Sequence, residues 1–357
     1  MRAATVVAYQ QPLEVGEVPD PQCGPLDAIV EVAAEGMCRS DWHTWNGEWG
    51  WLDTIYGIQD VWSPAPPFIP GHELAGTVVE VGSQVEKFKV GDRVTLPFNE
   101  GCGQCYACVK GDTQVCLMLG AGGFTHSGGY GRLTCIPKAD ITLVGLPESV
   151  DMVTAATLGC RYSTAYRGIV KQGSVRPGEW VAVFGAGGLG LSGIQIAAAL
   201  GANVIAIDPS AEAQQMAKAQ GAVATLSPHD DVHQEIAEIS GGGVHVSFGA
   251  VGEAEALTQS LLSLRMKGRH VHSGLTRMVD AGAQKLLMDL LVVRELTVTG
   301  AWGCPQSDFP ELLSLVSSGR LKPRALVTQE IGLEQISDVF RYMNTWENRG
   351  YTVITRY

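Results

Sequence analysis

The pattern of hydrophobic positions changes near residue 155 of the chain. Before that point, short apolar runs alternate with polar residues between Gly and Pro, as in LAGTVVEVGSQVEKFKVGDRVTL, residues 74–96. Alternation with a period of two predicts β-strands joined by turns, here at Gly82 and at Gly91-Asp92. The first 150 residues are therefore expected to form a β-rich domain.

After residue 155, apolar strands alternate with helical stretches. The segment EWVAVFGAGGLGLSGIQIAAALGANVIAID, residues 179–208, reads as a strand, a glycine turn, a helix and a second strand. Strands that alternate with helices predict a parallel, doubly wound α/β sheet. Residues 308–319 and 333–346 then predict two helices and residues 352–357 a strand, and we expect this last segment to return to the first domain.

Length and charge narrow the class of protein. The 357 residues exceed what one hydrophobic core usually serves, which favours two domains. A net charge of -12 argues against a nucleic-acid or acidic-membrane partner, because either would select a basic surface. The N-terminal MRAATVVAYQQPLEV predicts a strand and no signal peptide, and no stretch has the roughly 18 consecutive apolar residues of a membrane helix. We expect a cytoplasmic protein.

A glycine motif follows the first strand of the predicted sheet. Gly185, Gly187 and Gly190 form G-x-G-x-x-G between the strand WVAVF and the helix LSGIQIAAAL. Glycine permits the tight turn, the close approach of the backbone to a pyrophosphate and the packing of helix on strand, and the helix N-terminus favours an anion. The sequence predicts a dinucleotide site that also includes Gly188 and Leu189.

Asp208 ends the second strand of this unit, 18 residues after Gly190. Its carboxylate can accept hydrogen bonds from both ribose hydroxyls and would repel a 2′-phosphate. The residues that follow, Pro209, Ser210 and Ala211, offer no cation for such a phosphate. We therefore expect NAD(H) as the cofactor rather than NADP(H).

Four of the nine cysteines lie within GCGQCYACVKGDTQVC, residues 101–116. Cys102, Cys105, Cys108 and Cys116 have the spacing C-x2-C-x2-C-x7-C. In a reducing compartment such cysteines are more often metal ligands than disulfides. Four thiolates saturate a tetrahedral zinc and leave no position open for substrate, so we expect a structural ion, with an iron–sulfur site as the less favoured alternative.

Chemistry at a metal needs a second site with an open position. The segment GMCRSDWH contains Cys38, PGHELAG contains His72 and LGCRYSTAY contains Cys160. Each residue taken singly has an ordinary explanation as a buried thiol or a surface imidazole. The three segments do not by themselves establish a metal site.

These segments, the motif VGDRV, the four-cysteine loop and GAGGLG follow one another in the order found in zinc-dependent medium-chain alcohol dehydrogenases. The chain resembles that family over essentially its whole length. The resemblance implies a catalytic zinc held by Cys38, His72 and Cys160, with the fourth position left for water or alcohol. Such a zinc lowers the pKa of a bound hydroxyl, and the alkoxide then gives a hydride to NAD. The implied activity is the reversible oxidation of primary or secondary alcohols to aldehydes or ketones.

The resemblance also implies roles for residues around this zinc. Ser40 and His43 are similar to the family's proton relay, in which an imidazole that titrates near neutrality suits the outer position. Asp41 is similar to the carboxylate that orients the imidazole ligand, and Glu73 to one that lies behind the metal. Arg39 is similar to a cation that contacts the cofactor pyrophosphate.

The fold implied by the resemblance has two domains and a returning segment. A GroES-like β-rich catalytic domain with both zinc sites is expected over residues 1–160, and a Rossmann NAD-binding domain over residues 161–300. Residues 301–357 are expected to return to the catalytic domain. The family forms homodimers and homotetramers, and the sequence does not decide between them.

The chain departs from the family pattern in a long insertion, residues 44–68, between its first two predicted ligands. Five of the eight tryptophans lie between Trp42 and Trp62. We hypothesise that Trp49 and Trp51 form an aromatic lid over the substrate, which would favour bulky or aromatic alcohols. The alternative is that these rings pack a subunit contact or a small separate core.

Three further positions bear on specificity and affinity. Phe98 resembles a pocket-lining aromatic residue of the family. A basic residue of the family is replaced by Ala213, and another is replaced around Arg349 to Tyr351, which predicts weaker binding of NAD.

Two other functions remain open. A zinc-dependent polyol or sugar dehydrogenase of the same fold usually has a carboxylate in place of the third thiolate, so Cys160 counts against it. A non-enzymatic zinc-stapled protein would not need Ser40 and His43 beside the three ligands. Zinc-free quinone reductases of the superfamily are disfavoured by both metal sites.

Overall fold

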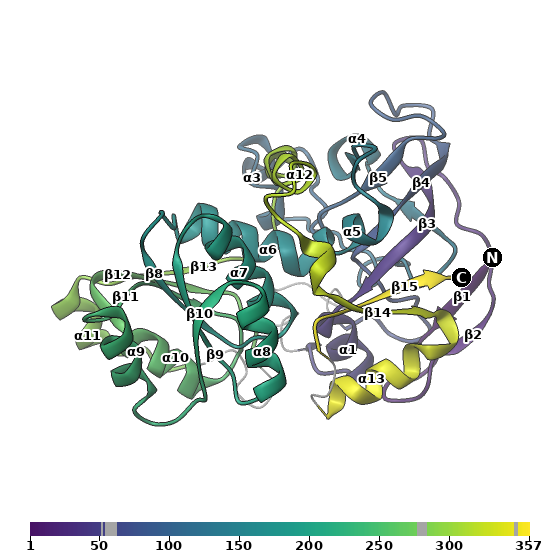
Figure 1. The fold of residues 1–357 in the computed structure, drawn as a ribbon. Coiled ribbons are helices and arrows are strands. Elements are labelled where there is room, and N and C mark those ends of the chain that lie inside the picture. Colours follow the sequence, from purple (N-terminus) through teal and green to yellow (C-terminus); the bar gives the residue numbers. More distant parts are fainter. Residues whose placement is uncertain (51–52, 54–62, 277–283, 346–348) are drawn as a thin grey trace. The chain divides into compact units, whose positions relative to one another are not determined.

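The computed structural model describes residues 1–50, 53, 63–276, 284–345 and 349–357. These form two compact units (Figure 1). Unit 1 comprises Met1–Ser163, Gly303–Gly319 and Pro323–Tyr357, and unit 2 comprises Thr164–Trp302 and Arg320–Lys322. Unit 1 therefore joins the N-terminal part of the chain to most of its C-terminal part.

The described residues of unit 1 form two sheets. A small antiparallel sheet joins β1 (Arg2–Thr5) to β2 (Glu14–Glu17). The larger sheet has the order β14-β15-β3-β4-β5-β7, with β6 pairing with β3. Its strands are β3 (Ala28–Met37), β4 (Leu74–Val81), β5 (Arg93–Thr95), β6 (Leu133–Ile136), β7 (Val144–Gly145), β14 (Val327–Gly332) and β15 (Tyr351–Arg356).

Among the described residues, the α-helices that lie wholly within unit 1 are short. They are α1 (Arg39–Asn46), α3 (Tyr106–Val109), α4 (Ala139–Thr142), α5 (Met152–Ala156), α12 (Phe309–Ser317) and α13 (Ile336–Asn344). The last two confirm the helices that the sequence predicts in the returning segment.

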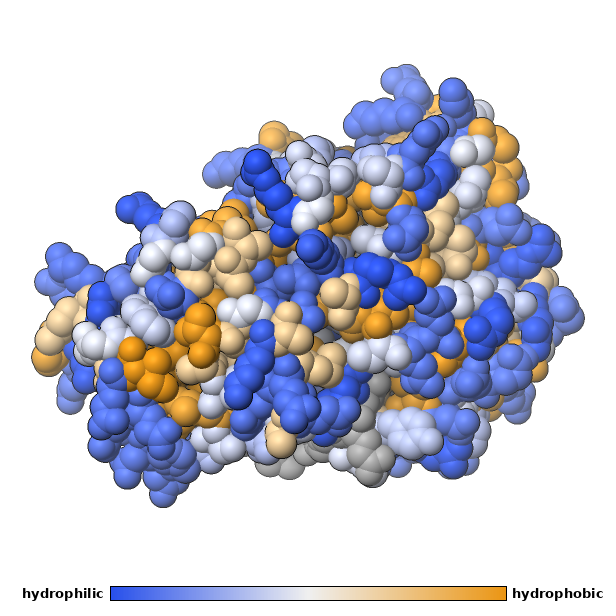
Figure 2. All heavy atoms as spheres, in the orientation of Figure 1, coloured by the Kyte–Doolittle hydropathy of each residue, from blue (hydrophilic) through white to orange (hydrophobic). Residues whose placement is uncertain are grey.

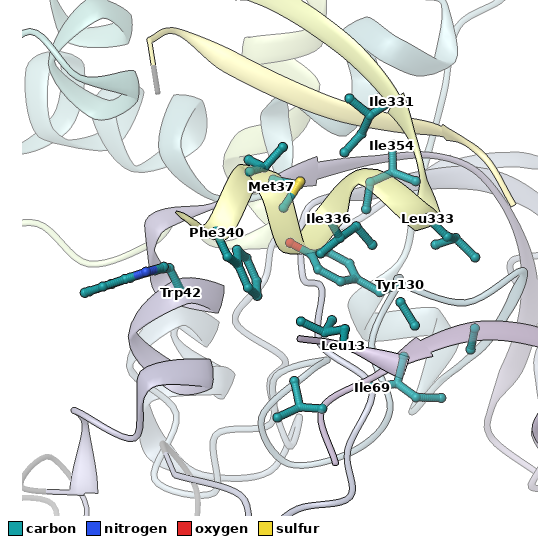
Figure 3. Packing of buried hydrophobic residues seen from close by; sticks show 14 of the residues in the cluster. Leu13, Met37, Trp42, Ile69, Tyr130, Ile331, Leu333, Ile336, Phe340 and Ile354 are labelled. Atoms are coloured by element: carbon teal, nitrogen blue, oxygen red, sulfur yellow. The ribbon is translucent and has the colours of Figure 1, made fainter. Parts of the chain in front are cut away.

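Helix α13 shows how the returning segment is attached. Ile336, Val339, Phe340 and Met343 recur at helical spacing, and all four are buried. They pack into one cluster with residues of β3, α1 and β15, among them Trp42 (Figure 3). The strand that leads to the first predicted metal ligand is thus held in place by residues about 300 positions later in the sequence.

The last strand, β15, runs antiparallel to the end of β3, with Thr352 opposite Met37. The sequence predicts this strand correctly. It does not predict β14, whose residues Thr328 to Glu330 are exposed. Strand β14 pairs with β15 at the end of the sheet order, so its polar side chains can face water.

Unit 2 confirms the predicted doubly wound sheet. Six parallel strands have the order β10-β9-β8-β11-β12-β13, which is the Rossmann order. The strands are β8 (Trp180–Phe184), β9 (Asn203–Ile207), β10 (Ala222–Leu226), β11 (Val244–Gly249), β12 (Leu264–His272) and β13 (Thr297–Gly300). The helices are α7 (Gly188–Ala199), α8 (Ala211–Ala219), α9 (Val232–Ser240), α10 (Ala254–Leu262) and α11 (Met288–Arg294).

On the face drawn in Figure 2, hydrophilic residues predominate and hydrophobic residues lie in small groups between them. Among the described residues, every helix is too short or too polar to span a bilayer.

Candidate functional site

The junction of β3 and α1 positions the first group of the site. Cys38 is the residue that precedes the helix, and its backbone is extended (φ -98°, ψ 154°). The carboxylate of Asp41, in the first turn of α1, accepts a hydrogen bond from the Cys38 N–H at 2.9 Å. An acid in the first turn satisfies a free backbone donor and suits the positive end of the helix. Both side chains are buried.

His72 lies in the segment just before β4, next to Gly71. Gly71 has φ +106°, and a Cβ there would come within 2.6 Å of the Tyr130 ring, so only glycine fits. The N–H of Gly71 and the Nδ1 atom of His72 lie 3.2 Å and 2.9 Å from the same Asp41 oxygen. Asp41 therefore fixes the imidazole through Nδ1 and leaves Nε2 for another partner.

Cys160 lies in a π-helical stretch, Leu158–Tyr162, that follows α5. A widened turn of this kind re-aims one side chain and is frequent at functional sites. Gly159 allows this turn to lie against the segment that bears His72, because a Cβ there would come within 2.8 Å of the Glu73 Cα. The close approach brings the Cys160 thiol to the other two groups.

Cys38, His72, Glu73 and Cys160 are all buried, and their potential ligand atoms lie within 4.8 Å of one another. The His72 Nε2 atom is buried and has no hydrogen-bond partner among the described residues. Two thiols gathered around a buried imidazole nitrogen fit a zinc ion with one open position.

Glu73 is tied to Arg161. Its Oε1 lies 2.9 Å from the Arg161 Nε and its Oε2 lies 2.6 Å from Nη2, a bidentate ion pair. The guanidinium carbon of Arg161 lies 3.7 Å from the centre of the Tyr351 ring on β15. Both oxygens of Glu73 are thus engaged by Arg161, which leaves Cys38, His72 and Cys160 as the three candidate ligands of this group.

Electrostatics favour ionisation of Cys38. Burial acts to raise the pKa of its thiol, but a hydrogen bond from Cys160 and the charge of His72 bring that pKa well below its ordinary value. A thiolate is the form that binds a metal. The Cys38 sulfur is also 3.5 Å from the hydroxyl of Ser40, so Ser40 lies at the edge of the same group.

Aromatic rings surround this group. Phe98 meets the His72 ring edge-on at 5.7 Å, and Phe124 lies 5.2 Å from the same ring. Trp49 stacks on Phe124 at 6.2 Å and on His43 at 5.0 Å. Trp49 thus lies beside the predicted relay, whereas Trp51 lies outside the described residues.

Phe124 was missed by the sequence analysis. It lies with His126 and Tyr130 in the glycine-rich segment GAGGFTHSGGYG, residues 120–131, and no spacing rule links it to His72. A phenylalanine directly after two glycines is the one signal that could have drawn attention to it.

The four-cysteine loop forms a second group. The sulfurs of Cys102 and Cys108 are 3.9 Å apart, and those of Cys105 and Cys116 are 3.8 Å apart. A tetrahedral ion with Zn–S bonds of about 2.3 Å places its sulfurs about 3.8 Å apart. The loop therefore fits one zinc, whereas a cluster of several irons needs its thiolates further apart.

In unit 2, the glycine motif has the geometry of a dinucleotide loop. Gly185 has φ +96°, and a Cβ on Gly190 would lie 1.7 Å from the Gly185 oxygen, so helix α7 packs tightly against the turn. Gly187 has open space where its Cβ would be. Gly188 and Leu189 begin the helix that comes next. The loop leaves room for a pyrophosphate at the N-terminus of α7.

Asp208 directly follows β9 and supports the glycine loop. Its Oδ2 accepts a hydrogen bond from the Ala186 N–H at 2.7 Å, and its Oδ1 accepts one from the Ser210 N–H at 2.9 Å. Arg39 has a different setting in unit 1, where it donates to the Met343 carbonyl and lies 4.5 Å over the Trp42 ring. Its contact with a cofactor stays a prediction.

Comparison with known proteins gives matches over nearly the whole chain. Residues 24–148 match the family described as alcohol dehydrogenase GroES-like domain, and residues 188–318 match the family described as zinc-binding dehydrogenase. An alcohol dehydrogenase of Geobacillus stearothermophilus is 32% identical over 360 residues, which cover 99% of this chain and 98% of that protein. The NAD-dependent alcohol dehydrogenase of Sulfurisphaera tokodaii is 31% identical and covers 99% of each chain.

Solved structures of alcohol dehydrogenases are similar to this chain over nearly its whole length. The alcohol dehydrogenase of Thermus sp. ATN1 has a TM-score of 0.88 with 28% identity, over 100% of both chains. The cobalt- and zinc-bound thermostable alcohol dehydrogenase of Pyrobaculum aerophilum has a TM-score of 0.83 with 28% identity, over 99% of both chains.

Proposed function

This chain belongs to the zinc-dependent alcohol dehydrogenase family, and from that premise we propose that Cys38, His72 and Cys160 hold its catalytic zinc. The observation that carries the assignment is the His72 Nε2 atom, buried without a hydrogen-bond partner among the described residues and close to two thiols. Zinc bound there would act as a Lewis acid on the alcohol oxygen. The protein is an NAD-dependent oxidoreductase that converts alcohols to aldehydes or ketones.

The reaction releases one hydride and one proton from the alcohol. The hydride passes to NAD, and the proton needs a path out of a buried site. Ser40 lies beside the Cys38 sulfur, and His43 is three residues further along the same helix. We assign the first step of proton removal to the Ser40 hydroxyl and the outer step to the His43 imidazole.

We infer that NAD is preferred over NADP. The support is Asp208, whose negative charge at the end of β9 would repel a 2′-phosphate. The cofactor preference is tested by comparing kcat/KM for NAD and NADP. A preference for NADP would refute the role of Asp208.

The substrate pocket is proposed to favour bulky or aromatic alcohols. The support is the group of rings formed by Trp49, Phe98 and Phe124 around the His72 imidazole. Planar rings offer an apolar surface on which another ring can stack.

A polyol or sugar dehydrogenase is the second candidate within the same fold. It is disfavoured because the carboxylate nearest to the ligand group, Glu73, is held by Arg161 on both oxygens. The position of the third ligand is filled by a thiol.

We further propose a homo-oligomer in the cytoplasm. Helix α11 buries none of its residues, and Met288, Val292 and Val293 are strongly exposed on it. Among the described residues, strand β13 ends the sheet order of unit 2, and its outer edge is the one we propose to pair with a second copy. Analytical ultracentrifugation tests this assembly.

One experiment tests the enzyme assignment directly. NAD reduction is followed spectrophotometrically for primary, secondary, aromatic and polyol alcohols, and zinc is counted by elemental analysis in the same preparation. We expect turnover of alcohols and two zinc ions per chain. Metal in the four-cysteine loop alone, with no NAD reduction, would refute the proposed catalytic site.

A further inference from the structure

The end of helix α1 brings a carboxylate back to His43. Gly47 has φ +73°, a left-handed conformation that favours glycine, and its N–H donates to the Thr44 carbonyl. The next N–H, that of Glu48, donates to the His43 carbonyl at 3.0 Å. These two bonds form the common helix-ending turn, which folds the chain back along the last turn of the helix. The side chain of Glu48 therefore lies beside that of His43.

The carboxylate of Glu48 is held at both oxygens. Its Oε2 lies 2.8 Å from the Nδ1 atom of His43, and its Oε1 accepts a hydrogen bond from the Asn46 side-chain amide. The His43 and Glu48 side chains are only 11% and 21% exposed, so the bond is largely shielded from water. An ionised carboxylate accepts hydrogen bonds only, so Nδ1 carries the proton and Nε2 is left to exchange one.

Two tryptophans fix the plane of the imidazole. Trp49 stacks on the ring with centroids 5.0 Å apart and planes 17° apart. Trp42 meets the ring edge-on at 5.0 Å. Stacking restricts the tilt of the ring, and the bond to Glu48 restricts its rotation within the plane.

We infer that Glu48 is a positioning residue that holds His43 in the one orientation and tautomer able to accept the alcohol proton at Nε2. The inference rests on the proposed role of His43 as the outer proton acceptor. A base oriented by a third group is a recurring arrangement in catalysis. During oxidation the proton goes from the alcohol oxygen through Ser40 to Nε2, and the negative charge of Glu48 stabilises the resulting imidazolium.

The surrounding charges agree with this role. Burial lowers the pKa of His43, and the hydrogen bond and charge of Glu48 oppose that effect. Arg39 acts to lower this pKa and Cys38 to raise it. Without Glu48 the imidazole would be a still weaker base.

The first test is the pH dependence of alcohol oxidation by the zinc-loaded Glu48→Gln enzyme, which loses the charge but keeps the shape. We expect the plateau of kcat/KM to fall on the order of 10-fold and the rising limb to move to lower pH, because the pKa of His43 falls. Glu48→Asp should recover part of the rate.

Glu235→Gln is the matched control, since Glu235 pairs with the exposed His229 at 3.0 Å, and it should leave the pH profile unchanged. An unshifted limb in Glu48→Gln would overturn the inference.

The second test is a double-mutant comparison. If Glu48 acts through His43, adding Glu48→Gln to a His43→Gln enzyme should lower kcat/KM no further. If Glu48→Gln lowers kcat/KM by the same factor in the parent enzyme and in the His43→Gln enzyme, Glu48 does not act through His43.

The third test does not depend on activity. In the zinc-loaded protein without cofactor, NMR of 15N-histidine should show a protected Nδ1 proton for His43 that disappears in Glu48→Ala and persists in Glu235→Ala. Absence of that proton in the parent protein would refute the orientation. If the parent protein oxidises no alcohol, the proposed function fails, while this spectrum still decides whether Glu48 orients His43.

Discussion

The two candidate metal-binding groups of unit 1 are built in opposite ways. Cys102, Cys105, Cys108 and Cys116 come from one short loop, and two of them are only partly buried. Cys38, His72 and Cys160 come from three separate segments and are all buried. The four cysteines are brought together by their spacing in one loop, whereas Cys38, His72 and Cys160 are brought together only when the whole unit has folded.

The contacts that support the two groups also differ: the loop is supported by its own backbone, and the buried group by side chains from other segments. In the loop, backbone N–H groups of Gln104, Cys105 and Met118 approach the cysteine sulfurs, so the chain itself supports its ligands. At the buried group, the supports are the charged side chains of Asp41 and Arg161. A closed site of four thiolates clamps the loop, whereas an open site of three ligands needs charged neighbours that hold its geometry.

The largest effect should come from removing a ligand of the buried group. In Cys160→Ala we expect kcat/KM to fall by about a thousandfold or more, because the metal that polarises the alcohol is lost. The zinc count should fall from two to one per chain, since the loop keeps its ion. Cys23→Ala, which removes a thiol outside both groups, is the control. Full activity in Cys160→Ala would contradict the assignment.

Removing a ligand of the loop should affect stability before chemistry. In Cys105→Ala we expect the loop to lose its zinc and the Tm to fall on the order of 10 °C, because metal binding contributes directly to folding. The catalytic rate per remaining zinc at low temperature should change little. Calorimetry and elemental analysis measure the two effects separately. If Cys105→Ala loses its catalytic rate while its Tm stays unchanged, the loop would be the catalytic group and not the structural one.

A smaller effect is expected when a support of the buried group is changed. Asp41→Asn keeps the shape but weakens the bond to the His72 Nδ1, and zinc affinity at that group should fall by about 10- to 100-fold. Competition with a chelator measures this zinc affinity. The zinc affinity of the four-cysteine loop should be unaffected. The control is Asp151→Asn, at the start of helix α5, where Asp151 accepts from the Thr154 N–H. Equal affinities in Asp41→Asn and the parent would show that the contact does not orient the ligand.

The smallest effect should concern substrate choice. Phe124→Ala removes a ring 5.2 Å from that of His72, and the ratio of kcat/KM for benzyl alcohol to that for ethanol should fall by about 5-fold. Tyr106→Ala, an exposed ring on the four-cysteine loop, should leave the ratio unchanged. A ratio that moves equally in both variants would argue against an aromatic pocket beside the buried group.

Local patterns explain what the sequence predicts well. The four-cysteine spacing, the glycine motif before α7 and the helices α12 and α13 each depend on residues within about 20 positions of one another. Glu48 also lies within reach of such reasoning, because the Asn46-Gly47 pair after α1 signals a turn that brings the next residue back.

Contacts between distant segments explain what the sequence does not predict. Arg161 meets Glu73 across 88 positions, and Phe124 meets His72 from a separate glycine-rich segment of unit 1. Strand β14 has three consecutive exposed residues and so lacks the alternation that predicts a strand. These features arise from the assembled sheet and not from any short stretch of residues.

The position of Tyr351 against Arg161 bears on how the protein acquires its metals during synthesis. Residues 1–163 leave the ribosome well before residues 351–356, and nearly all of unit 2 is made between them. The four cysteines of the loop are all present once residue 116 has been made. The group of Cys38, His72 and Cys160, proposed to hold the catalytic zinc, gains the Tyr351 ring against Arg161 only when the last strand has been made, so its final support forms late.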